Sequence, residues 1–375
     1  MLPYHHRANP AFQFASHPEG EYASGSPALV AASPTSASFF SPMLLSTKAY
    51  ARAGLVGNPS DGYFGKTVSF IVRDFWAEVI LYETPELHIQ HNERDETTFG
   101  SISDLAQSVR QFGYYGGVRL LKASVKRFFD YCTKETIALH GGNFTLRYES
   151  NIPPQVGMAG SSAIITACWR ALMEFYKVEI PRHILASLVL SVENDELGIP
   201  AGLQDRVIQS YEGLVFMDFN RAAVEKLGYG IYEELDPSLL PPLYIAYTSR
   251  LSEGTEVFHN DIRSRWNRGE REVVSAMYHW ANLAQRVRDM IHAGEGLKIG
   301  PLLNENFDLR RRLYKIGAGN IDMVESARSV GASAKFTGSG GAIVGTYEGE
   351  DMFQALKEVL EPKGYAVLKP QIMPA

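Results

Sequence analysis

Apolar and polar positions alternate with a period of two over residues 143–150, which predicts a half-buried strand. Beyond the small-residue segment that follows, apolar positions recur every three to four residues as far as about Lys177, which predicts a helix. Near the C-terminus, residues 334–344 have the pattern of two short strands joined by a glycine turn at 338–341. Similar helical patterns predict further helices near 182–195, over about 268–295 and from about 321 to 330.

The first part of the chain differs from the rest. Residues 1–46 are rich in Ser, Ala and Pro and show no helical or strand period, so we expect a disordered extension. An organelle transit peptide is the alternative, and the presence of a single arginine, Arg7, argues against it. From Lys48 onward, short apolar runs alternate with glycine-rich turns and amphipathic stretches, which is typical of a mixed α/β or α+β enzyme.

Composition narrows the class of protein. With 45% apolar and 21% charged residues, the chain has the composition of a folded protein, and 375 residues predict two or three domains. The net charge is −6 and no long basic run occurs, so we expect a small-molecule ligand and neither nucleic acid nor membrane as partner. Two cysteines are too few for a disulfide framework, and no apolar stretch approaches the length of a membrane helix. These features predict a soluble, cytoplasmic protein.

Residues 153–163, between the predicted strand and helix, have the composition of a phosphate-binding loop. Small residues leave backbone N–H groups uncovered, and the helix that follows adds the positive end of its dipole. The hydroxyls of Ser161 and Ser162 are placed to reach a metal ion. The alternative is that one of these serines only caps the helix.

Residues 48–67 contain a polar turn suited to hydrogen-bonding a polyol, with Asn58, Ser60 and Asp61 on it. A solvated turn is the alternative. The segment ends in Gly65-Lys66-Thr67, but it is not a P-loop, because Ser60 stands where that loop requires glycine.

Residues 193–206 place acidic side chains on either side of a sharp return of the chain at Gly198, Pro200 and Gly202. This pattern predicts that Glu193 and Asp205 share one site, as metal ligand and base. A solvated helix end is the alternative.

Two other patterns are excluded as sites. The glycine turn 338–341 is not a dinucleotide fingerprint, because Ile343 stands at the third glycine position. His88 and His91 have no third metal ligand after them and are expected to be a surface pair.

The segments 48–67, 153–163 and 338–341, in this order, resemble the three signature motifs of the GHMP small-molecule kinases. Met158 and Ala159 depart from the usual Gly-Leu-Gly-Ser-Ser of the second motif, but plant-type glucuronokinases share the Gly-x-x-Gly-Ser-Ser spacing found here. The similarity to these glucuronokinases covers residues 47–375 and rests on segments 51–67, 113–121, 201–207, 306–312 and 335–342.

The resemblance implies a two-domain α+β fold. After the extension 1–46, residues 47–235 would form an ATP-binding N-terminal domain like domain 2 of ribosomal protein S5. Residues 236–375 would form a ferredoxin-like C-terminal domain, with the active site between the two.

The resemblance also implies roles for single residues. Asp205 would be the catalytic base, Arg52 would lie near the transferring phosphoryl group, and Asn58 and Asp61 would bind the sugar. Mg²⁺ would be held by Ser162 and Glu193. The ATP phosphates would be held by Gly157, Ala159, Gly160, Ser161, Ser162 and Ala163, and covered by Gly338, Ser339 and Gly340.

The implied activity is ATP-dependent phosphorylation of the anomeric hydroxyl of D-glucuronate, feeding UDP-glucuronate synthesis. A uronate carboxylate needs a cation, preferably a bidentate arginine. The candidates are Arg119, Arg310, Arg311 and Arg312, of which Arg119 and Arg311 are expected at the substrate. The alternatives are a kinase for galacturonate, galactose, arabinose or fucose, and a non-catalytic sugar-binding regulator. The joint presence of Arg52, Ser162, Glu193 and Asp205 argues against the regulator.

Overall fold

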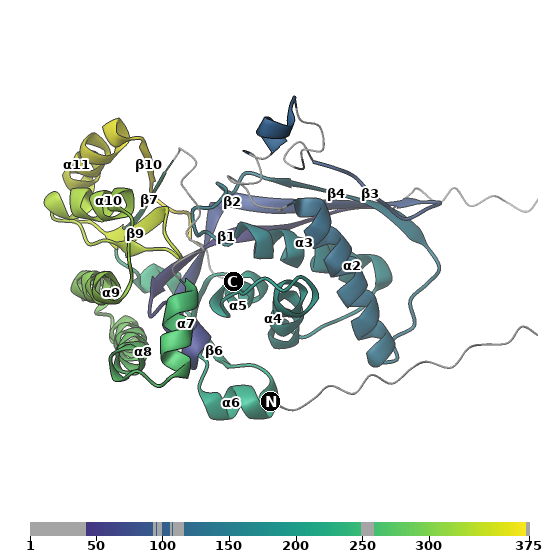
Figure 1. Ribbon diagram of the computed structural model, residues 1–375, viewed down its shortest axis with the longest axis horizontal. Coiled ribbons are helices and arrows are strands. Elements are labelled where there is room, and N and C mark those ends of the chain that lie inside the picture. The colour runs from purple at the N-terminus through teal and green to yellow at the C-terminus, as the bar shows by residue number, and fades with distance from the viewer. Residues whose placement is uncertain are drawn as a thin grey trace, which may run out of the picture. The chain divides into compact units, whose positions relative to one another are not determined.

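Two long antiparallel strands, β1 (Leu44–Val56) and β2 (Lys66–Thr84), form the centre of the computed structural model (Figure 1). The structure describes residues 43–92, 95, 100–105, 107, 116–248 and 259–372. Ala51, Ala53 and Leu55 on β1 are fully buried, and so are Val68, Phe70 and Val72 on β2. Because several neighbouring positions of β1 are buried on both faces, the strand lacks the alternation by which a strand is detected in a sequence.

The first sheet has six strands in the order β3-β4-β2-β5-β6, with β1 paired to β2. β3 is parallel to β4, and the other pairs are antiparallel. The C-terminal half of β2 pairs with β4 and its N-terminal half with β5. The remaining strands of this sheet are β3 (His88–Ile89), β4 (Asn143–Ser150), β5 (Leu214–Asp218) and β6 (Ile231–Leu235).

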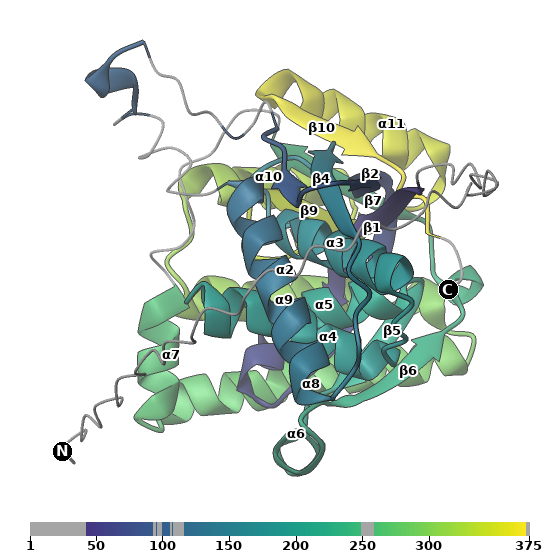
Figure 2. The same cartoon turned by 90° about the vertical axis from the view of Figure 1, so that its right-hand side faces the viewer.

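Helices cover one face of this sheet, as Figures 1 and 2 show. α3 packs directly on β1 and β2, α2 packs on α3, and α4 packs on α5. The apolar stripe of α3 is buried along its length, including Trp169. These helices are α2 (Gly117–Lys134), α3 (Gly160–Tyr176), α4 (Arg182–Ser191) and α5 (Gln204–Tyr211), and the short α6 (Arg221–Leu227) follows β5.

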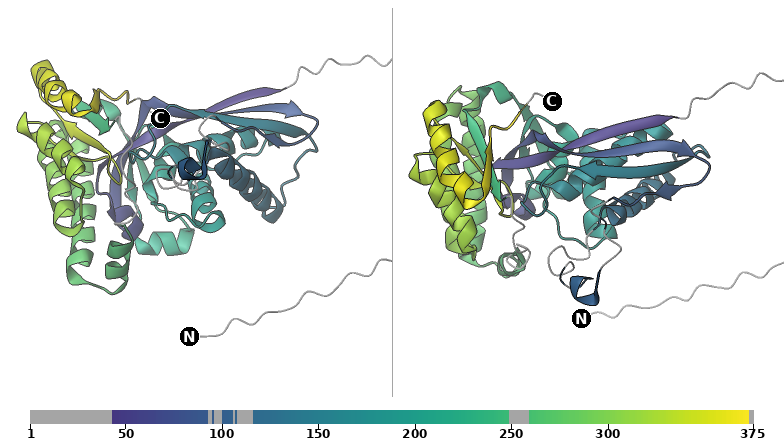
Figure 3. Two further views of the ribbon diagram at one scale, coloured as in Figure 1. Left: turned by 45° about the horizontal axis from the view of Figure 1, so that its top comes forward. Right: turned by 90° about the horizontal axis from the view of Figure 1, so that it is seen from above.

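The second sheet is antiparallel, in the order β10-β7-β9-β8, with α10 and α11 packed on it (Figure 3). Its strands are β7 (Leu243–Thr248), β8 (Lys335–Phe336), β9 (Ala342–Thr346) and β10 (Tyr365–Leu368). The helices of this part are α7 (His259–Asn267), α8 (Arg271–His292), α9 (Gly300–Leu313), α10 (Ala318–Ser329) and α11 (Gly349–Leu360).

Short helical turns connect these elements. α8 packs against β2 and against one of these turns, η1, so that the two sheets and their helices share a continuous core. The turns are η1 (Ser60–Tyr63), the π-helical turn η2 (Val192–Glu196), η3 (Pro237–Leu239), η5 (Gly296–Lys298) and η6 (Glu361–Lys363). Within the described residues, no helix is both long enough and apolar enough to span a membrane.

The structure confirms the elements with strong periodicity. The predicted strand 143–150 is β4, the helix after Gly160 is α3, and residues 334–344 form β8 and β9 with the glycine turn between them. The predicted helices near 182–195, 268–295 and 321–330 are α4, α8 and α10, although α4 ends at Ser191.

The N-terminal boundary differs from the expectation. β1 begins at Leu44, so residues 44–46 of the predicted extension belong to the strand, because Leu45 is buried and pairs with Leu81. Residues 1–42 lie outside the described part of the chain. The first sheet ends with β6 and the second begins with β7, and the domain boundary at residues 235 and 236 stays a prediction.

Candidate active site

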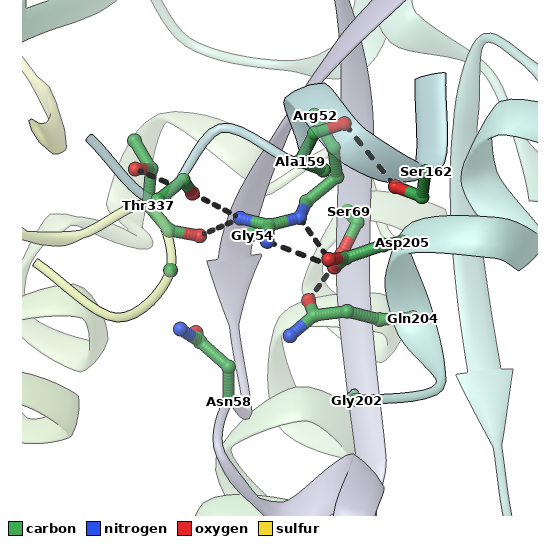
Figure 4. A network of polar contacts seen from close by, with 12 residues as sticks. Arg52, Gly54, Asn58, Ser69, Ala159, Ser162, Gly202, Gln204, Asp205 and Thr337 are labelled. Atoms are coloured by element: carbon green, nitrogen blue, oxygen red, sulfur yellow. Dashed lines mark hydrogen bonds and ion pairs between the residues drawn. The ribbon is translucent and has the colours of Figure 1, made fainter. Parts of the chain in front are cut away.

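The structure brings the three sequence motifs together around Arg52, near the centre of β1 (Figure 4). The Nε and Nη2 atoms of Arg52 both lie 2.8 Å from Oδ1 of Asp205. Its Nη1 donates to the carbonyl oxygens of Gly157, at 2.9 Å, and Thr337. One buried guanidinium therefore joins the predicted base, the predicted phosphate loop and the strand that leads into the glycine turn.

The predicted phosphate loop and the glycine turn are in direct contact. A Cβ on Gly157, whose φ is +68°, would lie 2.9 Å from the Gly340 oxygen and from the Ser339 nitrogen. A Cβ on Gly338 would lie 2.3 Å from the Gly157 oxygen. Because both approaches are backbone to backbone, only glycine fits at these positions. Ala159, also with positive φ (63°), precedes the first residue of α3, Gly160.

Asp205 lies in the first turn of α5, and Asp61 fixes that turn. Oδ2 of Asp61 accepts hydrogen bonds from the backbone N–H groups of Leu203, at 3.0 Å, and Gln204, at 3.3 Å. A Cβ on Gly202 would lie 2.9 Å from the same oxygen. Asp61, which the sequence predicts to bind the sugar, therefore positions the predicted base with one of its two carboxylate oxygens.

The environment of Asp205 raises its pKa above the ordinary value for a carboxyl group. Burial has the largest effect, Arg52 opposes it, and the negative charge of Asp61 adds to it. The Asp205 side chain is 16% exposed, so it can still be reached by a ligand. A carboxylate with a raised pKa holds a proton more strongly, which suits a general base.

Glu193 lies in the π-helical turn η2 and is 2% exposed. One carboxylate oxygen accepts a hydrogen bond from Ser161 Oγ at 2.8 Å, and the other is in an ion pair with Arg206. Ser162, predicted to share the metal with Glu193, instead donates its hydroxyl to the Ala159 oxygen at 3.1 Å. The structure thus brings Ser161, and not Ser162, to Glu193.

Two buried cations lie beside these motifs: Lys335, which received no role from the sequence, and Arg310, one of the four candidate arginines for the sugar carboxylate. Lys335 is 1% exposed and donates to the Gly54 oxygen at 2.6 Å and to Oδ1 of Asn58. Arg310 is 4% exposed and donates to the Gly338 oxygen at 2.7 Å. The sequence signal that marks Lys335 as unusual is that it is the single charged residue among the small, apolar and hydroxyl residues of 331–337.

The two arginines expected at the substrate lie apart from this group. Arg119 is exposed on α2 and donates to the Leu197 oxygen at 3.2 Å. Arg311 is exposed on α9 and forms an ion pair with Glu325 at 2.7 Å. Neither has a described contact with Arg52 or Asp205.

Comparisons with known proteins identify the family of the chain. Residues 119–213 match the family described as GHMP kinases N terminal domain. The chain is 44% identical over 335 residues to "Glucuronokinase 1" of Arabidopsis thaliana, covering 88% of this chain and 92% of that protein. "Probable glucuronokinase 2" of the same plant is also 44% identical over 335 residues, which cover 87% of this chain and 91% of that one.

Solved structures share the fold at low sequence identity. A galactokinase from Lactococcus lactis complexed with galactose superposes with a TM-score of 0.69 at 15% identity, covering 88% of this chain and 94% of that one. A mevalonate kinase from L. major in complex with R-mevalonate superposes with a TM-score of 0.63 at 17% identity, covering 89% of this chain and 98% of that one. Together with the 44% identity to the plant proteins, this fold places the chain in the GHMP kinase superfamily, as a member of the glucuronokinase family.

Proposed function

We propose that the protein transfers the terminal phosphoryl group of ATP to the anomeric hydroxyl of D-glucuronate, giving D-glucuronate 1-phosphate and ADP. As a member of this family the chain is a sugar kinase, and membership implies the use of ATP. The observation that carries the proposal is the contact of Arg52 with Asp205, Gly157 and Thr337 in a chain so similar to the plant glucuronokinases.

The proposed chemistry follows from the positions of these groups. Phosphoryl transfer passes through a loose transition state, so the protein must mainly align the partners and neutralise charge. Asp205 accepts the proton of the anomeric hydroxyl, and its raised pKa favours that transfer. Arg52 holds Asp205 in place and faces the charge that develops on the transferred group. The loop 157–163 and the turn 338–340 hold the phosphates with backbone N–H groups.

We also propose Glu193 and a serine hydroxyl of the loop as the protein's ligands for Mg²⁺. Among the described residues, no three His, Cys, Asp or Glu side chains gather into a metal site. The Glu193 carboxylate with the Ser161 hydroxyl still fits Mg²⁺, which binds through one or two protein oxygens plus phosphates and water. When bound, the ion neutralises phosphate charge. Ser162 Oγ, 3.1 Å from the Ala159 oxygen, is the alternative hydroxyl.

Replacing Glu193 with Gln is expected to raise the free Mg²⁺ concentration for half-maximal rate by about tenfold or more. The reason is that a charged carboxylate oxygen binds Mg²⁺ more strongly than the neutral amide oxygen that replaces it. The measurement is initial rate against free Mg²⁺ at fixed ATP. Glu196→Gln is the matched control, since Glu196 lies in the same turn and pairs with exposed Lys126 at 2.8 Å. An unchanged Mg²⁺ dependence in Glu193→Gln would rule Glu193 out as a ligand.

The test of the proposed function is ADP release by the purified protein with ATP and Mg²⁺ on a panel of sugars. The panel holds D-glucuronate, D-galacturonate, D-glucose, D-galactose, L-arabinose, L-fucose and mevalonate, and phosphorus NMR fixes the phosphorylated position. Preference for glucuronate with a 1-phosphate product is expected. Preference for a neutral sugar would overturn the uronate assignment. No ADP release with any of these substrates would overturn the proposed kinase activity.

A further inference from the structure

We propose that Arg310 binds the carboxylate of the sugar acid and so selects a uronate over a neutral sugar. The inference rests on the proposed function and names the residue that recognises the C6 charge. Arg310 is one of the four candidates from the sequence, which placed Arg119 and Arg311, the next residue of α9, at the substrate instead.

Arg310 is held rigidly from α9. Its Nη1 donates to the Gly338 oxygen at 2.7 Å and its Nη2 to the Ser339 oxygen at 3.3 Å. The guanidinium carbon lies 5.1 Å from the ring centre of Tyr314 and 5.2 Å from that of Phe336. Aromatic rings near the guanidinium and carbonyls at its edge fix its orientation before any ligand arrives.

This buried guanidinium has no carboxylate in contact with it among the described residues. Its two hydrogen bonds go to neutral carbonyls and use two of the five N–H donors that a guanidinium carries. Asp61 acts on it only through space, and Oδ2 of Asp61 is already engaged by backbone N–H groups. A buried cation without a counterion is costly, so an anionic ligand would be stabilised strongly here.

The position of Arg310 favours the sugar carboxylate over a phosphate of ATP. Arg52 is the arginine that contacts Gly157 on the phosphate loop. Arg310 donates to the Gly338 and Ser339 oxygens of the glycine turn. It also lies near enough to Asp61 and Tyr63 of η1, the turn predicted to hold the sugar, to interact with their charges. The planar fork of a guanidinium also matches the two oxygens of a carboxylate.

The other candidate cations fit this role less well. Burial, together with the charges of Arg310 and Arg52, holds the pKa of Lys335 well below its usual range, whereas an arginine keeps its charge. The exposed guanidinium of Arg311 already pairs with Glu325. Arg119 is also exposed and bonded to the Leu197 oxygen.

The test compares D-glucuronate with D-glucuronamide, which has nearly the same shape and lacks the charge. Arg310→Met is expected to raise KM for glucuronate roughly 10- to 100-fold, because it removes charge-assisted hydrogen bonds. The KM values for glucuronamide and ATP are expected to change about twofold or less, so that the preference for the acid disappears. Arg310→Lys keeps a positive charge but loses the planar pair of donors, so its KM for glucuronate is expected to lie between those of the wild type and Arg310→Met.

Two controls guard against a purely structural effect. Arg286→Met removes an exposed arginine of α8 that pairs with Glu305 at 3.8 Å, outside the site. The rise in thermal midpoint on adding glucuronate without ATP reports binding independently of turnover, and it is expected to shrink in Arg310→Met. If Arg310→Met does not fold, Arg310→Lys carries the same comparison.

The outcomes separate this inference from the proposed function. Equal increases in KM for glucuronate and glucuronamide would make Arg310 a structural residue, and a selective increase in KM for ATP would assign it to the nucleotide. A larger loss of the preference for glucuronate over glucuronamide in Arg311→Met than in Arg310→Met would restore the expectation from the sequence. Each of these results overturns the inference while wild-type turnover of glucuronate still supports the function. A wild-type enzyme that does not phosphorylate glucuronate would overturn both the inference and the proposed function.

Discussion

Replacing Asp205 with Asn is expected to lower kcat by roughly 10²–10⁴-fold while leaving ATP binding nearly unchanged, because the amide keeps the shape of the side chain but cannot accept a proton. Arg52 keeps its carbonyl acceptors on Gly157 and Thr337 in this variant, so the phosphate loop should hold its place. The measurements are steady-state kcat with glucuronate and direct titration with a non-hydrolysable ATP analogue.

The variant also leaves the buried Arg52 guanidinium without its counterion, and this is expected to reduce stability. The thermal midpoint must therefore be measured beside the rate. Asp218→Asn is the matched control, because Asp218 pairs with Lys66 at 3.2 Å, is partly buried at 19% exposure and lies outside the site. A kcat within about twofold of wild type in a folded Asp205→Asn protein would show that another group is the base.

Replacing Arg52 with Met is expected to lower kcat by roughly 10²–10³-fold and to move the acid limb of the kcat/KM profile to higher pH. Burial and Asp61 raise the pKa of Asp205, and Arg52 is the group that opposes them. Without Arg52 the carboxyl group should lose its proton only at a higher pH, so the active, ionised form should appear later on the pH scale. The measurement is kcat/KM for glucuronate across the acid range.

Two comparisons sharpen that experiment. In Arg52→Lys, kcat and the pH of the acid limb should lie between those of the wild type and Arg52→Met. Lysine restores the positive charge but not the planar pair of donors. Arg170→Met is the matched control, since Arg170 also binds one carboxylate, Glu212 at 2.9 Å, and two backbone carbonyls, those of Lys48 and Gln209. A limb that stays in place or moves to lower pH in Arg52→Met would contradict the coupling between Arg52 and Asp205.

Features set by local pattern were predictable from the sequence. The alternation in β4, the helical period of α3 and the glycine turn after β8 each follow from consecutive residues, and the structure has them at the expected places. The order of the three motifs also predicted the family, which the comparisons confirm. The sequence pattern did not predict β1, because its central residues are buried on both faces and do not alternate between apolar and polar.

Side-chain direction was the part that the sequence could not supply. Arg310 and Arg311 are neighbours with the same chemistry, but about 100° of helical rotation puts one in the interior and the other in solvent. The same holds for Ser161 and Ser162, of which only the first contacts Glu193. Such choices depend on how separate elements pack, and no spacing within one segment encodes them.

The hydrogen bond from Arg52 to Thr337 joins residues 285 positions apart, and it has a consequence for the growing chain. During synthesis, the β1 arginine emerges long before the segment that supplies its acceptor, so the centre of the site stays incomplete until Thr337 has left the ribosome. Contacts of such high sequence separation also form slowly, because the entropy of closing a long loop must be overcome first. Chains that terminate before residue 337 should therefore accumulate without catalytic competence, even where the first sheet has already formed.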